Sequence, residues 1–233
     1  MANGFFITGT DTGVGKTVIA GALLSVMRFR GIQACGMKPI ETGCSRVGGV
    51  LHPPDGLYLK KVARMSEAIS SITPYCFESP VAPLVASEME GRAIDIGIIK
   101  ASFRRLLEKY GTAVVEGIGG ILVPIKRDYY VLDLVRELGL PLIVVSSPFL
   151  GTINHTLLTV NYAFREGIRV AGIIINHNKP SDRTIAVRTN PDVLRRISPV
   201  PVISVFPHLR DLDEETVERA SLKHLHIETL IGK

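Results

Sequence analysis

The sequence has 233 residues, of which 46% are hydrophobic and 21% are charged, and its mean hydropathy is +0.27. These values exclude a disordered chain and a membrane bundle, and the length favours a single domain over residues 1–233. No apolar run approaches the roughly 18 residues of a membrane span, and no charged segment precedes an apolar one near the N-terminus. We therefore expect a cytoplasmic protein that does not bind membranes.

Charge and cysteine content argue against nucleic-acid binding, disulfides and a zinc site. The net charge of +5 arises without basic runs longer than pairs, and tryptophan is absent, which favours small anionic ligands over nucleic acid. The three cysteines form no CxxC pair, so we expect reduced, packed thiols rather than disulfides or a zinc site.

Short apolar runs rich in β-branched residues alternate with segments of helical period. The expected strands are residues 5–8, 34–37, 113–115, 142–145, 170–175 and 200–206. The expected helices are residues 16–29, 56–65, 95–109, 131–138, 152–166 and 214–222, and four of them are followed by glycine at position 31, 111, 139 or 167. This alternation predicts an α/β three-layer sandwich, in which helices cover both faces of a mostly parallel sheet.

Two segments lack a clear period. Residues 41–56 and 70–91 are rich in glycine or proline, and we expect both to be ordered loops over the carboxyl edge of the sheet. Ligands of open α/β sheets bind at that edge.

The segment GTDTGVGKT, residues 9–17, lies between the first expected strand and the first expected helix. Its glycines let successive N–H groups turn toward phosphate oxygens, and the following helix adds its positive N-terminal end. Lys16 is expected to reach the β- and γ-phosphates, and the hydroxyl of Thr17 to bind Mg²⁺. The loop is one residue longer than GxxxxGK[ST], because Thr10 stands where the first glycine is expected. A helix-capping turn is the alternative, but the order strand, loop, helix favours a P-loop NTPase-like fold.

Several classes of P-loop protein share such a segment. Partitioning and division-site ATPases place an extra lysine where this sequence has Asp11. The missing lysine favours a metabolic enzyme over a nucleotide-switched binding protein of the partitioning type, which we keep as the alternative. Amidating synthases of the same broader group usually carry a glutaminase portion, for which 233 residues leave no room.

Three charged residues are expected near the carboxyl edge of the sheet. Lys38 is either a solvated charge or a cation that lets a second anion approach ATP. Asp55, after two prolines, is either a turn residue or a metal ligand. Glu116 ends the strand 113–115 and precedes GIGG, whose N–H groups could face a ligand. Together with phosphate oxygens, Thr17, Asp55 and Glu116 form an adequate oxygen ligand set for Mg²⁺.

Residues near the other strand ends suit a base and a carboxylate. The amide of Asn176 offers a donor and an acceptor to adenine, and Pro207 and His208 could wall the same pocket. Residues 151–154 read GTIN at the start of an expected helix, where backbone donors either bind a carboxylate or simply cap the helix.

Five segments taken together resemble the dethiobiotin synthetase family, and the likeness spans nearly the whole chain. They are GTDTGVGKT, KPIETG, EGIGG with Pro124 following, LGTINHTLLT and the strand-ending Asn176. The resemblance implies a ligase that uses ATP to carboxylate 7,8-diaminopelargonate with CO₂ and to close the ring of dethiobiotin. A carbamate and a carbamic-phosphoric anhydride are the implied intermediates, and ADP and phosphate the other products. The longer P-loop is normal in that family.

The resemblance also assigns roles to residues. It implies Lys38, Lys16 and Thr12 as catalytic groups, Mg²⁺ as cofactor, and a homodimer with shared active sites. The implied nucleotide site comprises Gly13, Val14, Gly15, Lys16, Thr17, Val18, Asp55, Glu116, Gly117, Ile118, Gly119, Asn176, His177, Pro207 and His208. The implied substrate site comprises Thr12, Lys38, Thr42 and, from the partner subunit, the residues corresponding to Gly151, Thr152, Ile153 and Asn154. Thr42 stands where family members often have serine, and the exchange keeps the hydroxyl.

Overall fold

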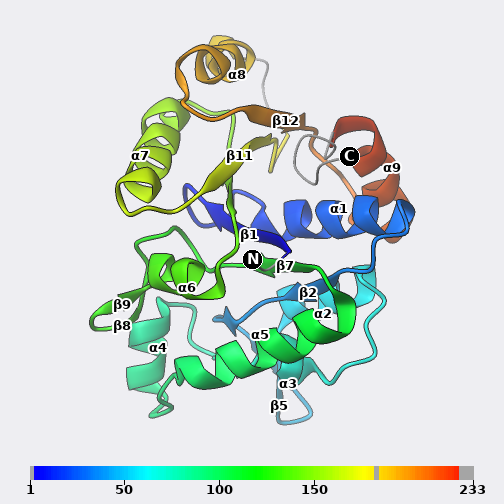
Figure 1. Cartoon of the computed structure of the whole chain (residues 1–233), viewed down its shortest axis with the longest axis vertical. Helices are drawn as coiled ribbons and strands as arrows, with labels where there is room; N and C mark the ends of the chain where they lie inside the picture. Colours follow the sequence, from blue (N-terminus) through cyan, green and yellow to red (C-terminus); the bar gives the residue numbers. More distant parts are fainter. Residues whose placement is uncertain (1–2, 181–183, 226–233) are drawn as a thin grey trace.

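A computed structural model of the chain describes residues 3–180 and 184–225. Within these ranges, six parallel strands form a central sheet in the order β12-β11-β10-β1-β7-β2 (Figure 1). They are β1 (Gly4–Gly9), β2 (Cys35–Met37), β7 (Ala113–Glu116), β10 (Leu142–Ser146), β11 (Val170–Asn176) and β12 (Val202–Phe206). The six predicted strands are confirmed, and their ends differ from the predicted ones by at most two residues.

Helices cover both faces of this sheet, so its strands are buried on two sides and their sequences are nearly continuous apolar runs. One face packs on α1 (Lys16–Phe29), α2 (Pro54–Val62) and α9 (Glu214–His224). The other packs on α5 (Ile96–Tyr110), α6 (Val131–Leu138), α7 (Thr152–Arg165) and α8 (Ile185–Ile197). Neighbouring residues of β1 divide between the two cores: Phe6 packs on one side, Phe5 and Ile7 on the other. The predicted three-layer sandwich is confirmed.

Glycine marks the helix ends as the sequence predicts. Gly111 and Gly139 are left-handed C-cap residues of α5 and α6, and Gly31 and Gly167 adopt positive φ just beyond α1 and α7. None of the helices in residues 3–180 and 184–225 is long and apolar enough to cross a lipid bilayer.

The expectation of two irregular loops is wrong in part. Residues 41–56 contain a hairpin, because Gly48 and Gly49 both adopt positive φ and so connect two antiparallel strands by a tight turn. Pro83 begins a helix in the second segment, at the first helical position where its missing N–H does no harm. The elements are β3 (Ile40–Glu41), β4 (Ser45–Val47), β5 (Val50–His52), α3 (Ile69–Ile72), β6 (Tyr75–Cys76) and α4 (Pro83–Met89).

Two further features were not predicted. Pro191 lies inside α8 and interrupts the helical pattern, which hid this helix in the sequence. A short antiparallel pair, β8 (Pro124–Lys126) and β9 (Tyr129–Tyr130), precedes α6.

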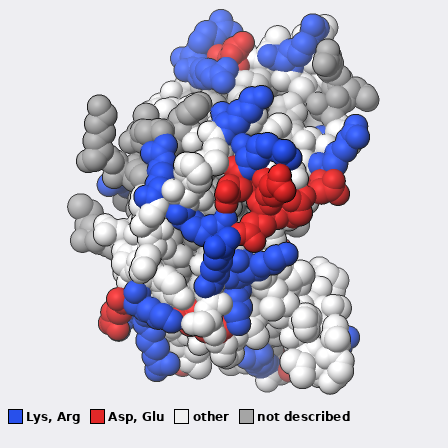
Figure 2. Space-filling model, turned by 90° about the vertical axis from the view of Figure 1, so that its right-hand side faces the viewer, with Lys and Arg blue, Asp and Glu red and all other residues white. Residues whose placement is uncertain are grey.

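The last helix is attached to the first face by charge as well as by apolar contact. Arg28 of α1 forms ion pairs with Glu214 and Glu218 of α9, and Arg64 also pairs with Glu214. Figure 2 shows acidic side chains gathered on this face with basic side chains around them. Such exposed pairs contribute little individually, about 1 kcal/mol or less, so the apolar contacts of Val217 and Leu225 dominate the docking.

Candidate active site

The loop between β1 and α1 has the backbone geometry of an anion site. Gly13 and Gly15 adopt φ of 75° and 94°, and Gly15 is the N-cap of α1 without any side-chain cap. The first N–H groups of α1 are therefore left for a ligand, and the positive helix end favours an anion. A Cβ at Gly15 would lie 2.1 Å from Nδ2 of Asn176, so only glycine fits there.

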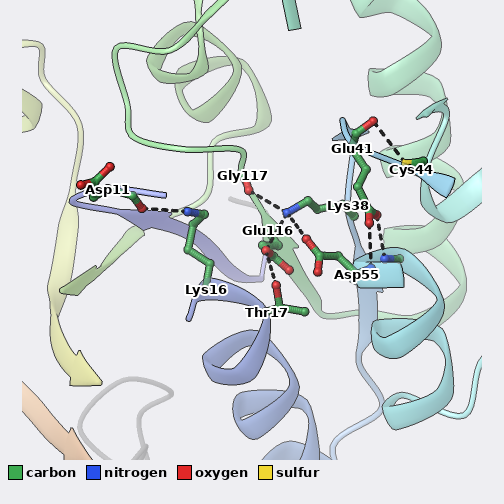
Figure 3. Close-up of polar contacts among 10 residues, drawn as sticks. Asp11, Lys16, Thr17, Lys38, Glu41, Cys44, Asp55, Glu116 and Gly117 are labelled. Carbon is green, nitrogen blue, oxygen red and sulfur yellow. Dashed lines mark hydrogen bonds and ion pairs between the residues drawn. The ribbon is translucent and has the colours of Figure 1, made fainter. Parts of the chain in front are cut away.

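Lys16 lies behind this loop and is almost fully buried. Its Nζ donates a hydrogen bond to the backbone oxygen of Asp11 at 3.1 Å (Figure 3). Burial, with a smaller contribution from the charge of Lys38, lowers the pKa of Lys16 to about 8. Phosphate oxygens beside Nζ would favour the charged ammonium, so the loop suits a polyphosphate.

Lys38 lies between two carboxylates. Its Nζ is 2.6 Å from Oε1 of Glu116, 2.8 Å from Oδ2 of Asp55, and it donates to the backbone oxygen of Gly117 at 3.2 Å (Figure 3). Burial opposes the charged form, but Glu116 and Asp55 outweigh it and raise the pKa of Lys38 above its usual range. The buried lysine is therefore an ammonium at neutral pH.

Glu116 joins this cluster to the helix that follows the loop. Register pairs it with Ile7 of β1, and Oγ1 of Thr17 donates to its Oε1 at 2.9 Å. Its Oε2 is buried and has no hydrogen-bond partner in the described part of the chain. Glu116, Thr17 and Asp55 thus converge on one point beside the loop, as Figure 3 shows.

These oxygens suit magnesium. Carboxylate and hydroxyl oxygens are the hard donors that Mg²⁺ prefers, and the unpartnered Oε2 of Glu116 is a free acceptor beside Thr17. Within the described ranges, no three His, Cys, Asp or Glu side chains form a cage that would hold a metal alone. A Mg²⁺ ion here would complete its coordination with phosphate oxygens and water, which is its usual mode of binding.

A second buried carboxylate, which the sequence did not reveal, supports the cluster. Glu41 is 4% exposed and accepts hydrogen bonds from the N–H groups of Asp55 at 2.8 Å and Gly56 at 3.0 Å. Burial, then the charge of Asp55, raise the pKa of Glu41 to about 7. Its place in KPIETG, three residues after Lys38, was the only signal in the sequence, because the helix start that it caps lies 13 residues later.

Asn176 contacts the loop from β11. Its Nδ2 donates to the backbone oxygen of Val14 at 2.8 Å, so the amide is held against the loop. Asn178, which the sequence analysis did not single out, donates in the same way to the oxygen of Gly13 at 2.7 Å. His177 follows on the same edge, and its N–H donates to the oxygen of Phe206 directly before Pro207 and His208. The predicted base-side residues therefore lie together beside the loop.

The predicted substrate residues fall in two places. Thr12 is exposed in the loop, and Thr42 is half-buried after β3, four residues beyond Lys38. Residues 151–154 lie at the start of α7, after β10, whereas Lys38 follows β2. Since β1 and β7 lie between β10 and β2, two strands lie between residues 151–154 and Lys38 within one chain.

Fold and site together define a class. A parallel α/β sheet, a glycine loop that leaves helix N–H groups free, and a buried lysine behind that loop characterise a P-loop nucleotide-binding protein.

Comparisons with known proteins agree with this class and narrow it. The family model described as "AAA domain" matches residues 3–216. ATP-dependent dethiobiotin synthetase BioD of Thermodesulfovibrio yellowstonii is 42% identical over 239 residues, covering 100% of both chains. The proteins of the same name from Bacillus subtilis and Clostridium kluyveri are 39% and 34% identical and cover 99% and 94% of this chain, and 98% and 91% of their own length. The chain belongs to the AAA domain family and, within it, to the ATP-dependent dethiobiotin synthetases.

Solved structures share the fold at low sequence identity. The septum site-determining protein MinD complexed with Mg-ADP, from Pyrococcus horikoshii, has a TM-score of 0.55 and 15% identity, covering 96% of this chain and 88% of its own. A ParA family ATPase from Chlorobium tepidum has a TM-score of 0.53 and 16% identity, covering 95% and 90%. These likenesses confirm the predicted P-loop NTPase-like fold and concern the fold alone.

Proposed function

We propose that the chain, as one domain over residues 1–233, is a cytoplasmic ligase that forms dethiobiotin from 7,8-diaminopelargonate and CO₂ with ATP. Full-length similarity to proteins of that name supports this function. The observation that carries it in the structure is Lys38, an almost fully buried ammonium held beside a nucleotide loop. A hydrolase that transfers the γ-phosphate to water needs no second buried cation there, whereas a ligase must bring a second anion to ATP.

The reaction proceeds in three bond-forming steps. One substrate amine forms a C–N bond with CO₂ and loses a proton, which gives a carbamate. A carbamate oxygen attacks the γ-phosphorus as the bond to the β-phosphate oxygen breaks and ADP leaves. The second amine then forms a C–N bond with the carbamoyl carbon and loses a proton, phosphate leaves, and the ring closes.

The proposed catalytic residues allow two anions, the carbamate and ATP, to approach each other. The ammonium groups of Lys16 and Lys38 offset the repulsion between the carbamate and the triphosphate. The hydroxyls of Thr12 and Thr42 donate hydrogen bonds to the carbamate or to the transferred phosphoryl group. In the structure, the charge of Lys38 is balanced by Asp55 and Glu116.

The proposed nucleotide site follows the loop and the edge beside it. Phosphates lie against the loop and the start of α1, and the base lies between Asn176 and the segment after β12. Because Nδ2 of Asn176 donates to Val14, its side-chain oxygen remains for the amino group of adenine. The residues are Gly13, Val14, Gly15, Lys16, Thr17, Val18, Asp55, Glu116, Gly117, Ile118, Gly119, Asn176, His177, Pro207 and His208.

Mg²⁺ is the proposed cofactor, held by Thr17, Asp55 and Glu116. It would neutralise negative charge on the phosphate oxygens of ATP while the γ-phosphoryl group passes to the carbamate. The orphaned oxygen of Glu116 and the hydroxyl of Thr17 support this assignment.

We also propose a homodimer in which the partner's segment corresponding to residues 151–154 holds the distant carboxylate of the substrate. Two strands separate this segment from Lys38 within one chain, and its helix start carries no side-chain cap. Leu150 and Leu158 beside it are 90% and 61% exposed, an apolar surface suited to a second copy. Size-exclusion chromatography with light scattering is expected to give the mass of a dimer at assay concentration. A fully active monomer would contradict the shared site.

ATP consumption tests the proposed function directly. We expect release of ADP and phosphate only when both 7,8-diaminopelargonate and bicarbonate are present, with one dethiobiotin formed per ADP. Omitting either compound is the control. A partitioning-type ATPase would hydrolyse ATP without them, and that result would favour the alternative function.

A further inference from the structure

Helix α2 begins without a cap of its own. Its N-cap residue, Pro53, makes no side-chain hydrogen bond, and Pro54 at the first helical position has no N–H. The free donors of the first turn are therefore the N–H groups of Asp55 and Gly56. Both donate to the same carboxylate, since Oε1 and Oε2 of Glu41 accept them at 2.8 and 3.0 Å.

Close packing limits this turn at a second point. A Cβ at Gly56 would lie 2.0 Å from Oγ1 of Thr73, so the turn also touches the buried residue that follows α3. The segments that carry Glu41 and Thr73 lie side by side, because β3 pairs with β6 through Ile40 and Tyr75. The start of α2 therefore packs against this pair of segments.

Two residues of the segment 38–41 contact Asp55. Nζ of Lys38 lies 2.8 Å from Oδ2 of the Asp55 side chain, and Glu41, three residues later, binds the Asp55 backbone (Figure 3). The side chain of Asp55 is only partly buried, with 33% of its surface exposed, so packing alone does not fix it. Its direction depends on these two contacts.

A cap that served stability alone would need no charge. Ser, Thr or Asn caps a helix start without bringing a second carboxylate near Asp55. Here the capping carboxylate is buried, which carries a desolvation cost that a neutral cap avoids. A carboxylate accepts two hydrogen bonds at once, which a single hydroxyl does not. It therefore fixes two consecutive N–H groups and, with them, the orientation of the turn.

We propose that Glu41 is a positioning residue for this site: its paired hydrogen bonds hold the first turn of α2 so that Asp55 faces Lys38 and the magnesium ion that accompanies the nucleotide. The inference rests on the proposed role of Asp55 as a magnesium ligand. Glu41 itself touches neither metal nor substrate and acts through Asp55.

The test measures how much Mg²⁺ improves nucleotide binding. The dissociation constant of a non-hydrolysable ATP analogue is determined by calorimetry in excess Mg²⁺ and in chelator, for wild type, Glu41→Ala, Asp55→Ala and the double variant. We expect Glu41→Ala to reduce the magnesium-dependent gain in affinity by about 10-fold, the scale of losing a group that orients a metal ligand. Affinity in chelator should stay near the wild-type value. The double variant should lose no more than Asp55→Ala alone, because Glu41 acts through Asp55.

Matched variants separate positioning from general stability. Asp95 caps α5 by accepting from the N–H of Gly97 at 2.7 Å, far from the loop in sequence. Asp95→Ala removes a carboxylate cap and should lower the melting temperature without changing the magnesium-dependent gain. Glu41→Gln keeps one acceptor oxygen and should fall between wild type and Glu41→Ala, which provides a second readout where the alanine variant folds poorly.

The possible outcomes separate the inference from the proposed site. If Glu41→Ala and Glu41→Gln keep the full magnesium-dependent gain, or if the losses from Glu41 and Asp55 simply add, the positioning role is overturned. If Asp55→Ala itself keeps the full gain, the magnesium role of Asp55 and the inference fall together. In that case ADP release that requires diamine and bicarbonate would still support the proposed reaction.

Discussion

Lys38→Ala is expected to lower turnover by about 100-fold or more, the scale of losing one charge partner in a transition state. In the proposed reaction the ammonium groups of Lys38 and Lys16 offset the repulsion between the two anions, and alanine at position 38 removes one of these two charges. ATP binding should be largely preserved, because the loop, Lys16 and Asn176 remain. Steady-state ADP release with saturating diamine and bicarbonate, together with calorimetry of nucleotide binding, measures the two effects separately.

The same substitution has a cost in stability that follows from the geometry. Removing Lys38 leaves the buried Glu116 carboxylate beside Asp55 without its cation, and breaking such a buried pair typically costs about 3 kcal/mol or more. We expect a folded protein with a lower melting temperature. Lys100→Ala, which removes only a partly exposed ion pair with Glu137, is the control and should change neither turnover nor melting temperature much. Wild-type turnover in a folded Lys38→Ala protein would remove Lys38 from the mechanism.

Local sequence features identified the parts of the site that depend on local structure. The loop of residues 9–17 could be placed because strand, glycines and helix follow one another along the chain. Lys38 and Glu116 could be placed at one edge, because parallel strands end on the same side of a sheet. Asp55 was left between a turn and a metal ligand. The structure places it on the first turn of α2, 2.8 Å from Lys38, and its role as a metal ligand stays a prediction.

What the sequence did not reveal depends on contacts between distant segments. Glu41 caps a helix that begins 13 residues later, so no local capping pattern marks it. Asn178 binds the loop across 165 residues of sequence. Helix α8 was not predicted for a different reason. Proline is rare inside helices, so Pro191 argues locally against a helix at this position. For Glu41 and Asn178 the partner is distant in sequence, whereas for α8 the packing of the folded chain overrides the local preference.

Gly15→Ala is expected to weaken nucleotide binding by about 100-fold, equivalent to roughly 2.7 kcal/mol. Two causes combine. Gly15 adopts a φ of 94°, which strains any other residue by about 1–3 kcal/mol, and an added Cβ would lie 2.1 Å from Nδ2 of Asn176. Relief of that collision must displace Asn176 from its hydrogen bond to Val14 or reshape the loop, and either change disrupts the phosphate and base contacts at once. Calorimetry with Mg²⁺ and an ATP analogue measures the loss.

Gly31→Ala is the matched control, because Gly31 follows the opposite end of the same helix with a φ of 73° and open space where its Cβ would lie. It carries the same kind of backbone strain without the collision, so it should lower the melting temperature and leave nucleotide affinity unchanged. If Gly15→Ala binds the nucleotide as tightly as Gly31→Ala, the contact between the loop and Asn176 is not needed for binding. Adenine recognition through Asn176 would then lose its structural support.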